Sequence, residues 1–422
     1  MRSWYELGFV KGDLETVRGK ISAEWKYENG EFIYTVDLPE GIDASLGGEK
    51  LEAGKNVFCV YIDFELVCLF QQKKGELMKY IVGYPIKENK SFLNAIVQNK
   101  DSISEVYFSW GDIPNGRSVL SVDDEMTPFE IQQRQAGDLK YLSANGIKLN
   151  MLFNANCYGK DSQSRAFFYK IGNLIDYIER EFELSSVTTS SPLIAKFIKE
   201  NFEGIDVRAS VNMEIGSIEG MSYVSDFFDS FYVRRELNRN LPALARLRKW
   251  CDENGKQMYL LANSGCLNNC SAHVFHDNLV AHESEISAMD NGYQFRGVCW
   301  DFLADEKRRE KWLSRTNFIR PEDIELYEGL VPAMKLATRV NSAPVRVLEA
   351  YVGKKYRGSV MELLEPNHSG AFYPSYIENA NFDVNFAKTV MSCNKNCEDC
   401  GYCNEVMKRA SVKLADDPSA KV

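Results

Sequence analysis

The chain has 422 residues, of which 45% are hydrophobic and 26% are charged, which is the composition of a folded globular protein rather than a disordered one. No run reaches the roughly 18 apolar residues that span a bilayer, and the N-terminus lacks the apolar stretch of a signal peptide. We therefore expect a cytoplasmic protein that does not enter a membrane. Its net charge of −10 disfavours binding to a phosphate backbone unless a local basic patch outweighs it.

Residues 1–75 are predicted to form a β-rich accessory segment. Residues 20–38 alternate apolar and polar side chains on both sides of Asn29-Gly30, a dipeptide that accepts the positive φ angles of a tight hairpin turn. A further strand-rich run covers residues 57–70. The residues from Gly19 to Glu40 resemble the C-terminal β-sandwich of bacterial α-L-rhamnosidases. The catalytic domain of those enzymes has no counterpart here, so we interpret the segment as an accessory or fusion remnant.

From residue 79 onward, short β-branched runs alternate with segments whose apolar residues recur at helical spacing, which is typical of βα units on a parallel sheet. Thr127-Pro128 with Glu130 predicts a capped helix start, and Ser191-Pro192 predicts another. No glycine-rich phosphate fingerprint follows the first strand, which disfavours a Rossmann fold. The predicted strands cover residues 80–86, 105–110, 147–153, 186–190, 206–212, 230–237 and 257–262, with an eighth at 317–319.

This pattern predicts an α/β protein with a TIM-like (β/α)8 barrel over residues 79–352 and a C-terminal extension over residues 353–422. In such a barrel, functional side chains follow the carboxyl ends of the strands. Arginine and lysine there can also form an anion pocket, although each is equally well explained as a partner in an ordinary ion pair. We predict substrate binding by Asn154, Asn212, Arg235, Lys335 and Arg339.

Two groups of cysteines suggest metal sites. Thiols stay mostly reduced in a cytoplasm, so clustered cysteines there are metal ligands more often than disulfide partners. Cys266 and Cys270 follow a predicted strand, and with Cys299 and one further thiol, for which Cys157 is a candidate, they would hold a 4Fe-4S cluster. The alternative is that Cys266 and Cys270 are small buried hydrophobic side chains at a turn.

The second group is a C-x3-C-x2-C-x2-C run near the C-terminus, made of Cys393, Cys397, Cys400 and Cys403. Four thiols within eleven residues suit zinc or a second iron-sulfur cluster, and spacing does not separate the two. The first three cysteines match the spacing of the radical-SAM triad. That triad normally stands at the start of the barrel sequence and leaves one iron free, so a radical-SAM site is disfavoured here. A third alternative is that these thiols complete the cluster begun by Cys266 and Cys270.

Three of the four histidines, His273, His276 and His282, lie within ten residues beside the first cysteine pair. Imidazole titrates near neutral pH, so three histidines this close together suggest acid-base catalysis or metal ligation. We predict catalytic roles for His276 and Asp277, and for Glu236, which Arg234 and Arg235 precede. Hydrogen-bonded loop residues and ordinary ion pairs are the alternatives.

The barrel region resembles peptidase family U-32, the collagenase-like group, over residues 79–410. The resemblance is carried by Asp206-Val-Arg-Ala-Ser-Val-Asn212, by Tyr232-Val-Arg-Arg-Glu-Leu237, by Ala262-Asn-Ser-Gly-Cys266 with Cys270, and by Arg320-Pro-Glu-Asp-Ile324, Lys335-Leu-Ala-Thr-Arg339 and Val347-Leu-Glu-Ala-Tyr351. It implies a TIM-like barrel and a cysteine-bound 4Fe-4S cluster. Several relatives are implicated in oxygen-independent hydroxylation of RNA bases or quinone precursors. The family's "HGALC...SGRC" stretch is reduced here to Asn263-Ser264-Gly265-Cys266, and Ala337 replaces the glutamate of its "KIEGR" run.

These observations favour an iron-sulfur enzyme that acts on a small molecule or a nucleobase, with an electron donor or partner protein. Two alternatives remain open, a collagenase-like peptidase with a structural metal site and a zinc-stabilised, non-enzymatic scaffold. The sequence has neither a G-x-S-x-G elbow nor an H-E-x-x-H zinc helix, so no known protease motif supports the peptidase alternative.

Overall fold

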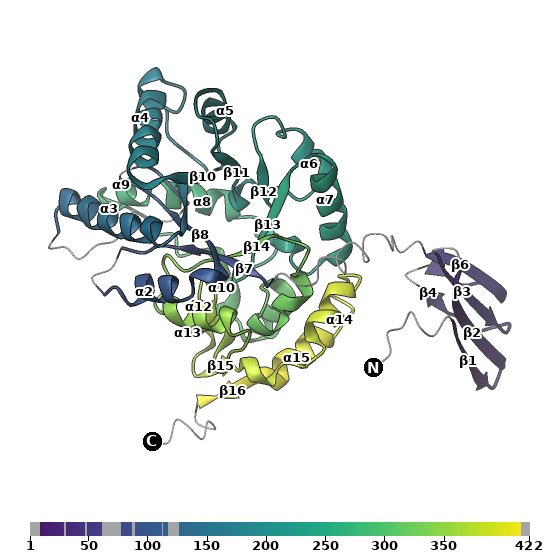
Figure 1. The fold of residues 1–422 in the computed structure, drawn as a ribbon. Coiled ribbons are helices and arrows are strands. Elements are labelled where there is room, and N and C mark those ends of the chain that lie inside the picture. Colours follow the sequence, from purple (N-terminus) through teal and green to yellow (C-terminus); the bar gives the residue numbers. More distant parts are fainter. Residues whose placement is uncertain are drawn as a thin grey trace. The chain divides into compact units, whose positions relative to one another are not determined.

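The structure is a computed structural model that describes residues 9–28, 31–46, 49–60, 77–86, 89–111, 113–116 and 126–414 (Figure 1). The chain divides into two compact units, Met1–Lys73 and Lys74–Val422. The predicted C-terminal extension belongs to the same unit as the predicted barrel.

The first unit contains an antiparallel sheet with the strand order β1-β2-β3-β6. Its strands are β1 (Phe9–Thr16), β2 (Gly19–Glu28), β3 (Glu31–Leu38) and β6 (Gly54–Val60), and β4 (Ser45–Leu46) pairs with β5 (Glu49–Lys50). Glu28 pairs with Glu31 across Asn29-Gly30, so the predicted hairpin is confirmed, although the two turn residues lie outside the described residues. The predicted run at 57–70 is a strand up to Val60, and residues 61–70 also lie outside the described part.

The second unit is a closed barrel of eight parallel strands, which confirms the predicted fold class (Figure 1). The strands are β7 (Lys79–Gly83), β8 (Ile103–Phe108), β9 (Lys148–Phe153), β10 (Leu184–Thr189), β11 (Asp206–Ala209), β12 (Ser230–Tyr232), β13 (Gln257–Leu261) and β14 (Ala333–Leu336). Each pairs with its neighbour in sequence, and β14 closes the ring by pairing with β7, Met334 opposite Tyr80.

The prediction of the eighth strand was wrong. Residues 317–319 are not a barrel strand; the Ile319 amide donates to the Ala262 carbonyl oxygen, 2.8 Å away, just beyond the end of β13. The strand that closes the barrel is β14, which pairs with β13 on one side and with β7 on the other. Two other predictions were too long, because β11 and β12 each give way to a 3₁₀ helix after a few residues, η3 (Val211–Met213) and η4 (Arg235–Leu237).

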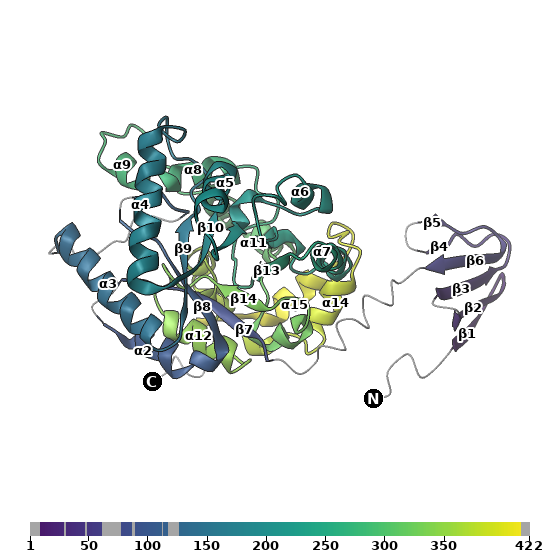
Figure 2. The ribbon, with the colours of Figure 1, turned by 45° about the horizontal axis from the view of Figure 1, so that its top comes forward.

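Helices α2 to α7 lie outside the strands in both views (Figures 1 and 2). They are α2 (Ser91–Gln98), α3 (Pro128–Ala144), α4 (Arg165–Phe182), α5 (Pro192–Asn201), α6 (Ile218–Ser222) and α7 (Leu241–Glu253), with η2 (Lys100–Ser102) before β8. Both predicted helix starts are confirmed: Thr127 and Glu130 form a capping box on α3, and the Ser191 side chain caps α5.

A long insertion separates β13 from β14. It contains α8 (His273–Ala281), α9 (Glu283–Ser287), α10 (Val298–Ala304), α11 (Glu306–Arg309), η5 (Trp312–Arg315) and η6 (Pro321–Tyr327). After β14 follow α12 (Pro344–Val352), η7 (Val360–Leu363), α13 (Ser369–Phe372), β15 (Ser375–Ile377), η8 (Asn379–Asn381), α14 (Phe386–Ser392), α15 (Tyr402–Ala410) and β16 (Ser411–Lys413).

The insertion and the C-terminal elements share one apolar core. Trp312 and Phe318 of the insertion pack in one cluster with Met361, Phe386 and Met407 from beyond β14, and each of these side chains is buried. Burial of large apolar side chains is the main force that holds such layers together, so the cysteine-rich C-terminus is fixed to the barrel by packing. Among the described helices, none combines the length and the apolar character needed to cross a membrane.

Candidate functional site

A cavity of about 120 Å³ opens among the loops that follow the carboxyl ends of the barrel strands. It brings together ten of the residues that the sequence predicts for catalysis, substrate binding or metal ligation. These are Asn154, Asn212, Arg235, Lys335, Arg339, Cys266, Cys270, Cys299, His276 and Asp277. Their predicted roles stay predictions, but their convergence makes this cavity the candidate site.

Two cations contribute to the lining of the cavity from β14 and the turn after it. The Lys335 ammonium lies 4.1 Å from the ring centre of Tyr107 and 4.7 Å from that of Tyr232. The Arg339 guanidinium donates to the Ser109 hydroxyl, 3.1 Å away. Aromatic faces attract a desolvated cation, so a positive charge is held where an anionic group of a ligand can meet it. Sequence reasoning missed both tyrosines because only the closed barrel brings β8, β12 and β14 together.

Arg235 joins the strand ends to the cysteine loop. Its Nη1 lies 3.3 Å from the Cys266 sulfur and its Nη2 lies 3.4 Å from an oxygen of Glu214. Burial acts to lower the pKa of Arg235, but the neighbouring Cys266 and Glu214 outweigh it and the net direction is upward. The Arg235 guanidinium therefore places a positive charge beside the sulfur of Cys266.

The turn into Cys266 depends on a glycine. A Cβ on Gly265 would collide with the carbonyl oxygen of Pro366, and the Gly265 amide donates to the Glu365 carbonyl, 3.0 Å away. Glycine lets two backbones approach this closely. The backbone of Glu365 and Pro366, which passes beside this turn, therefore explains the small residues before Cys266. The sequence alone does not reveal that neighbour.

Glu236 lies beside the cysteine loop and is not among the residues that line the cavity. Its carboxylate accepts from the Asn269 amide and from Arg234 Nε, each at 3.2 Å. Asn269 stands between the two cysteines of the loop and has a left-handed φ of 53°. The structure thus gives Glu236 a positioning contact to the loop, and its predicted part in proton transfer stays a prediction.

The histidines are divided among different contacts. His273 lies 3.2 Å from a Glu214 oxygen and 3.4 Å from an Asp277 oxygen, and Asn156 also donates to Asp277 at 3.2 Å. His276 lines the cavity and meets the ring of Phe295 edge-on. Glu214, which sequence reasoning missed, is half-buried, and its hydrogen bond with His273 and the nearby arginines lower its pKa in spite of burial.

The three thiols of the cavity influence one another. Burial and the nearby sulfurs of Cys266 and Cys270 raise the pKa of Cys299. Within the described residues, no three His, Cys, Asp or Glu side chains are grouped to hold a single metal ion.

Cys157 lies outside this lining. It follows β9 on the same rim of the barrel, and its sulfur accepts from the Gly159 amide at 3.4 Å. Among the contacts of the described residues, none joins Cys157 to the three thiols of the cavity.

The four C-terminal cysteines form a separate group around the loop between α14 and α15, and none of them lines the cavity. Burial and the neighbouring thiols raise the pKa of Cys397, and burial raises that of Cys403 to about 11. The Lys395 ammonium, between the first two thiols in sequence, donates to the carbonyl oxygens of Val390 and Arg239. The loop is also tied to η5 by the ion pairs of Glu398 with Lys311 and Arg315.

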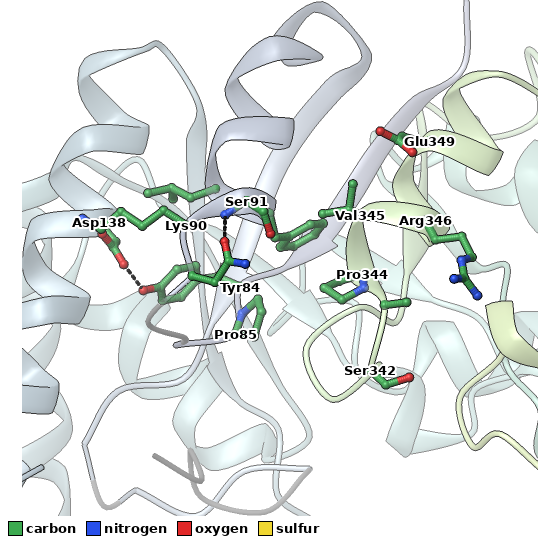
Figure 3. Close-up of a pocket in the computed structure, with 14 residues that line it drawn as sticks. Tyr84, Pro85, Lys90, Ser91, Asp138, Ser342, Pro344, Val345, Arg346 and Glu349 are labelled. Atoms are coloured by element: carbon green, nitrogen blue, oxygen red, sulfur yellow. Dashed lines mark hydrogen bonds and ion pairs between the residues drawn. The ribbon is translucent and has the colours of Figure 1, made fainter. Parts of the chain in front are cut away.

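A second cavity, of about 440 Å³, lies where α2 and α12 begin (Figure 3). Three of its charged side chains are already paired: Asp138 accepts from Tyr84 at 2.5 Å and meets Lys90 at 3.1 Å, and Arg346 donates to Glu362 at 2.6 Å. It contains no thiol and none of the predicted site residues, so the first cavity remains the candidate.

The comparisons with known proteins agree with this architecture. The chain is 26% identical over 317 residues to "Uncharacterized protease MJ1657" of Methanocaldococcus jannaschii, a match that covers 72% of this chain and 88% of the archaeal protein. The chain is a homologue of this archaeal protein. Among solved structures, a U32 peptidase, Mk0906, is 11% identical with a TM-score of 0.46, over 62% of this chain and 93% of that one. Residues 3–55 match the model of the bacterial α-L-rhamnosidase C-terminal domain. The resemblances predicted from the sequence are thereby confirmed.

Proposed function

We propose that the chain is an iron-sulfur enzyme of the U-32 type that modifies a small molecule or an RNA nucleobase by oxygen-independent hydroxylation or a related reaction. The observation that carries the proposal is the single cavity shared by Cys266, Cys270 and Cys299 with Lys335 and Arg339. Thiols, cations and polar groups that converge on one cavity at the carboxyl ends of barrel strands are what such an enzyme requires.

The chain's own residues have separate tasks in this proposal. Cys266, Cys270 and Cys299 would hold the cluster, which when bound supplies one-electron redox chemistry. Arg235 donates to the sulfur of Cys266, and hydrogen bonds to cluster sulfurs tune the reduction potential. Electrons would come from a donor protein.

The substrate would be oriented by the remaining groups. Lys335 and Arg339 would hold an anionic group, while the amides of Asn154 and Asn212 would accept and donate hydrogen bonds to the rest of the molecule. His276 and Asp277 would move protons at the edge of the cavity, because both line it and because imidazole and carboxylate groups commonly serve as general acids and bases.

Metal analysis after anaerobic purification tests the proposal. We expect bound iron and sulfide with brown visible absorbance, and we expect Cys266→Ser to lose most of that absorbance. Cys251→Ser is the matched control, because Cys251 is buried away from the cavity beside Met221 and should leave the iron content unchanged. Colourless wild-type protein without iron would remove the proposal.

The C-terminal cysteines would hold a second metal, either zinc or another cluster. The same metal analysis of Cys397→Ser separates this site from the cluster site at Cys266. The substitution should reduce the zinc content or a fraction of the iron content and leave the metal at Cys266 in place.

A peptidase is the second candidate, since the archaeal homologue carries the name protease. Cleavage of gelatin-like peptides that survives Cys266→Ser would favour it, with any metal serving structure alone. Stoichiometric zinc without iron and without turnover would instead indicate a non-enzymatic scaffold.

A further inference from the structure

One carboxylate, that of Glu214, is tied to the loop between Cys266 and Cys270 through three other side chains. Glu214 follows η3, beyond the end of β11, and lies outside the lining of the thiol cavity. The segment after β11 and the cysteine loop after β13 are about fifty residues apart in the chain, so the closed barrel brings them together.

Two of the connecting side chains are neighbouring arginines. Arg235 Nη2 lies 3.4 Å from a Glu214 oxygen, and Nη1 of the same guanidinium donates to the Cys266 sulfur at 3.3 Å. The other Glu214 oxygen lies 3.7 Å from Arg234 Nη2, which donates to the side-chain oxygen of Asn269 at 3.4 Å. A guanidinium is a rigid planar fork, so a carboxylate that holds one side of it also fixes where the other side points.

The third connecting side chain is His273. Its Nδ1 lies 3.2 Å from the Glu214 oxygen that also meets Arg235, and its backbone amide donates to the Cys270 carbonyl oxygen at 3.0 Å. The cysteine loop is therefore held at its first, fourth and fifth residues by groups that one carboxylate contacts.

The backbone around Glu214 is shaped for these contacts. Glu214 has a left-handed φ of 55°, which is costly for a residue with a Cβ and is kept where the surrounding structure holds it. Two residues later, a Cβ on Gly216 would collide with the Arg234 side chain, so glycine leaves the space through which that arginine reaches the loop. The Arg234 amide donates to the Ile215 carbonyl oxygen at 2.8 Å, which fixes the two segments side by side.

We propose that Glu214 is a positioning residue that holds the Arg235 guanidinium on the Cys266 sulfur and thereby sets the reduction potential of the iron-sulfur cluster. The inference rests on the proposed function, which places that cluster on Cys266, Cys270 and Cys299. Reduction adds an electron, so a nearby cation and a hydrogen bond to a sulfur favour the reduced cluster, while a nearby anion opposes it. Arg235 and Glu214 therefore shift the potential in opposite directions.

The test uses the full-length, anaerobically purified protein and a redox titration of the cluster, followed by its electron paramagnetic resonance signal. Arg235→Gln should lower the midpoint potential, because it removes a positive charge and the donor to the Cys266 sulfur. Glu214→Gln should raise the midpoint potential, because glutamine keeps an oxygen that accepts from the guanidinium and removes only the negative charge. Glu219→Gln is the matched control, because Glu219 is an exposed residue of α6 where solvent screens the charge, and it should leave the potential unchanged.

Glu214→Ala separates positioning from charge. Alanine removes the charge and also releases the guanidinium, so the potential of this variant should lie below that of Glu214→Gln. In an Arg235→Gln background the two substitutions of Glu214 should give the same potential, because no guanidinium is left to hold. If Glu214→Ala assembles no cluster, the shifts of the two glutamine variants decide the outcome.

The outcomes distinguish this inference from the proposed function. Colourless wild-type protein without iron would remove both. The inference alone fails if the wild type holds a cluster but Arg235→Gln and Glu214→Gln do not shift its potential in opposite directions. It also fails if alanine and glutamine in place of Glu214 give equal potentials beside Arg235, or different potentials without Arg235.

Discussion

His368 is 1% exposed, and neither of its ring nitrogens has a hydrogen-bond partner among the residues that the structure describes. It follows the Glu365-Pro366 turn that borders the thiol cavity, and its ring meets the edge of Trp300. Burial lowers the pKa of His368 to about 4, because a charged imidazole there would have no counter-ion.

The position of that pKa predicts a dependence of stability on pH. Between pH 6.5 and 4 the unfolded chain binds a proton at His368 and the folded chain does not, so the free energy of unfolding should fall by about 3 kcal/mol across this range. His368→Phe removes the titrating group and keeps an aromatic ring, so its pH slope should be flatter. Urea unfolding of both proteins at pH 7, 5.5 and 4 measures the difference. If the free energy of unfolding fell equally with pH in both proteins, His368 would not be the source of the pH dependence and the prediction would be wrong.

At the scale of single residues, the sequence located most of the polar and thiol side chains that line the cavity, because thiols, amides and cations after strand ends are conspicuous. It could not locate Glu214 or Tyr107, whose residue types are common and whose importance comes from what the fold places beside them.

At the scale of elements, the barrel strands are joined by a polar network inside the closed sheet. Arg208 on β11 lies 2.5 Å from Glu105 on β8 and 2.6 Å from Asp206. Glu105 also accepts from Asn150 on β9 at 2.7 Å and from Ser186 on β10 at 3.2 Å. One carboxylate therefore contacts side chains of three other strands.

Removing that charge should destabilise the barrel. Glu105→Gln leaves the buried Arg208 with less compensation, and we expect a loss of about 3 kcal/mol in the free energy of unfolding. Glu200→Gln is the matched control, because Glu200 pairs with Lys196 on the exposed face of α5 and should cost no more than about 0.5 kcal/mol. Equal effects of the two substitutions in urea unfolding would contradict a structural role for the network.

The lengths of the elements show what periodicity can detect. Seven strands were found from their β-branched runs, whereas the four residues of β14 were missed and residues 317–319 were taken in its place. Ile319 is buried and extended like a strand residue, but its amide bonds to the chain beyond β13 rather than within the sheet. Only the closure of the ring distinguishes the two segments.

At the scale of the whole molecule, the β-rich unit and the barrel unit are separate compact units within one chain. Each has its own sheet. A compact unit with its own core can in principle fold by itself.

Deletion of residues 1–73 should therefore change the free energy of unfolding of the barrel by no more than about 0.5 kcal/mol. Near-ultraviolet circular dichroism during urea unfolding, together with iron content after anaerobic purification, measures the effect on the barrel. A truncated protein that fails to fold or loses its metal would show that the first unit supports the second.

The sequence by itself determined the fold class, the hairpin of the first unit, both helix caps and the residue types of the cavity, because each depends on neighbours within one turn or one strand. The tertiary structure decided which strand closes the barrel and which thiols share a cavity. Closure of the barrel pairs Met334 with Tyr80, 254 residues apart in the chain, and such contacts are set by packing and closure of the sheet, which leave no periodic trace in the sequence.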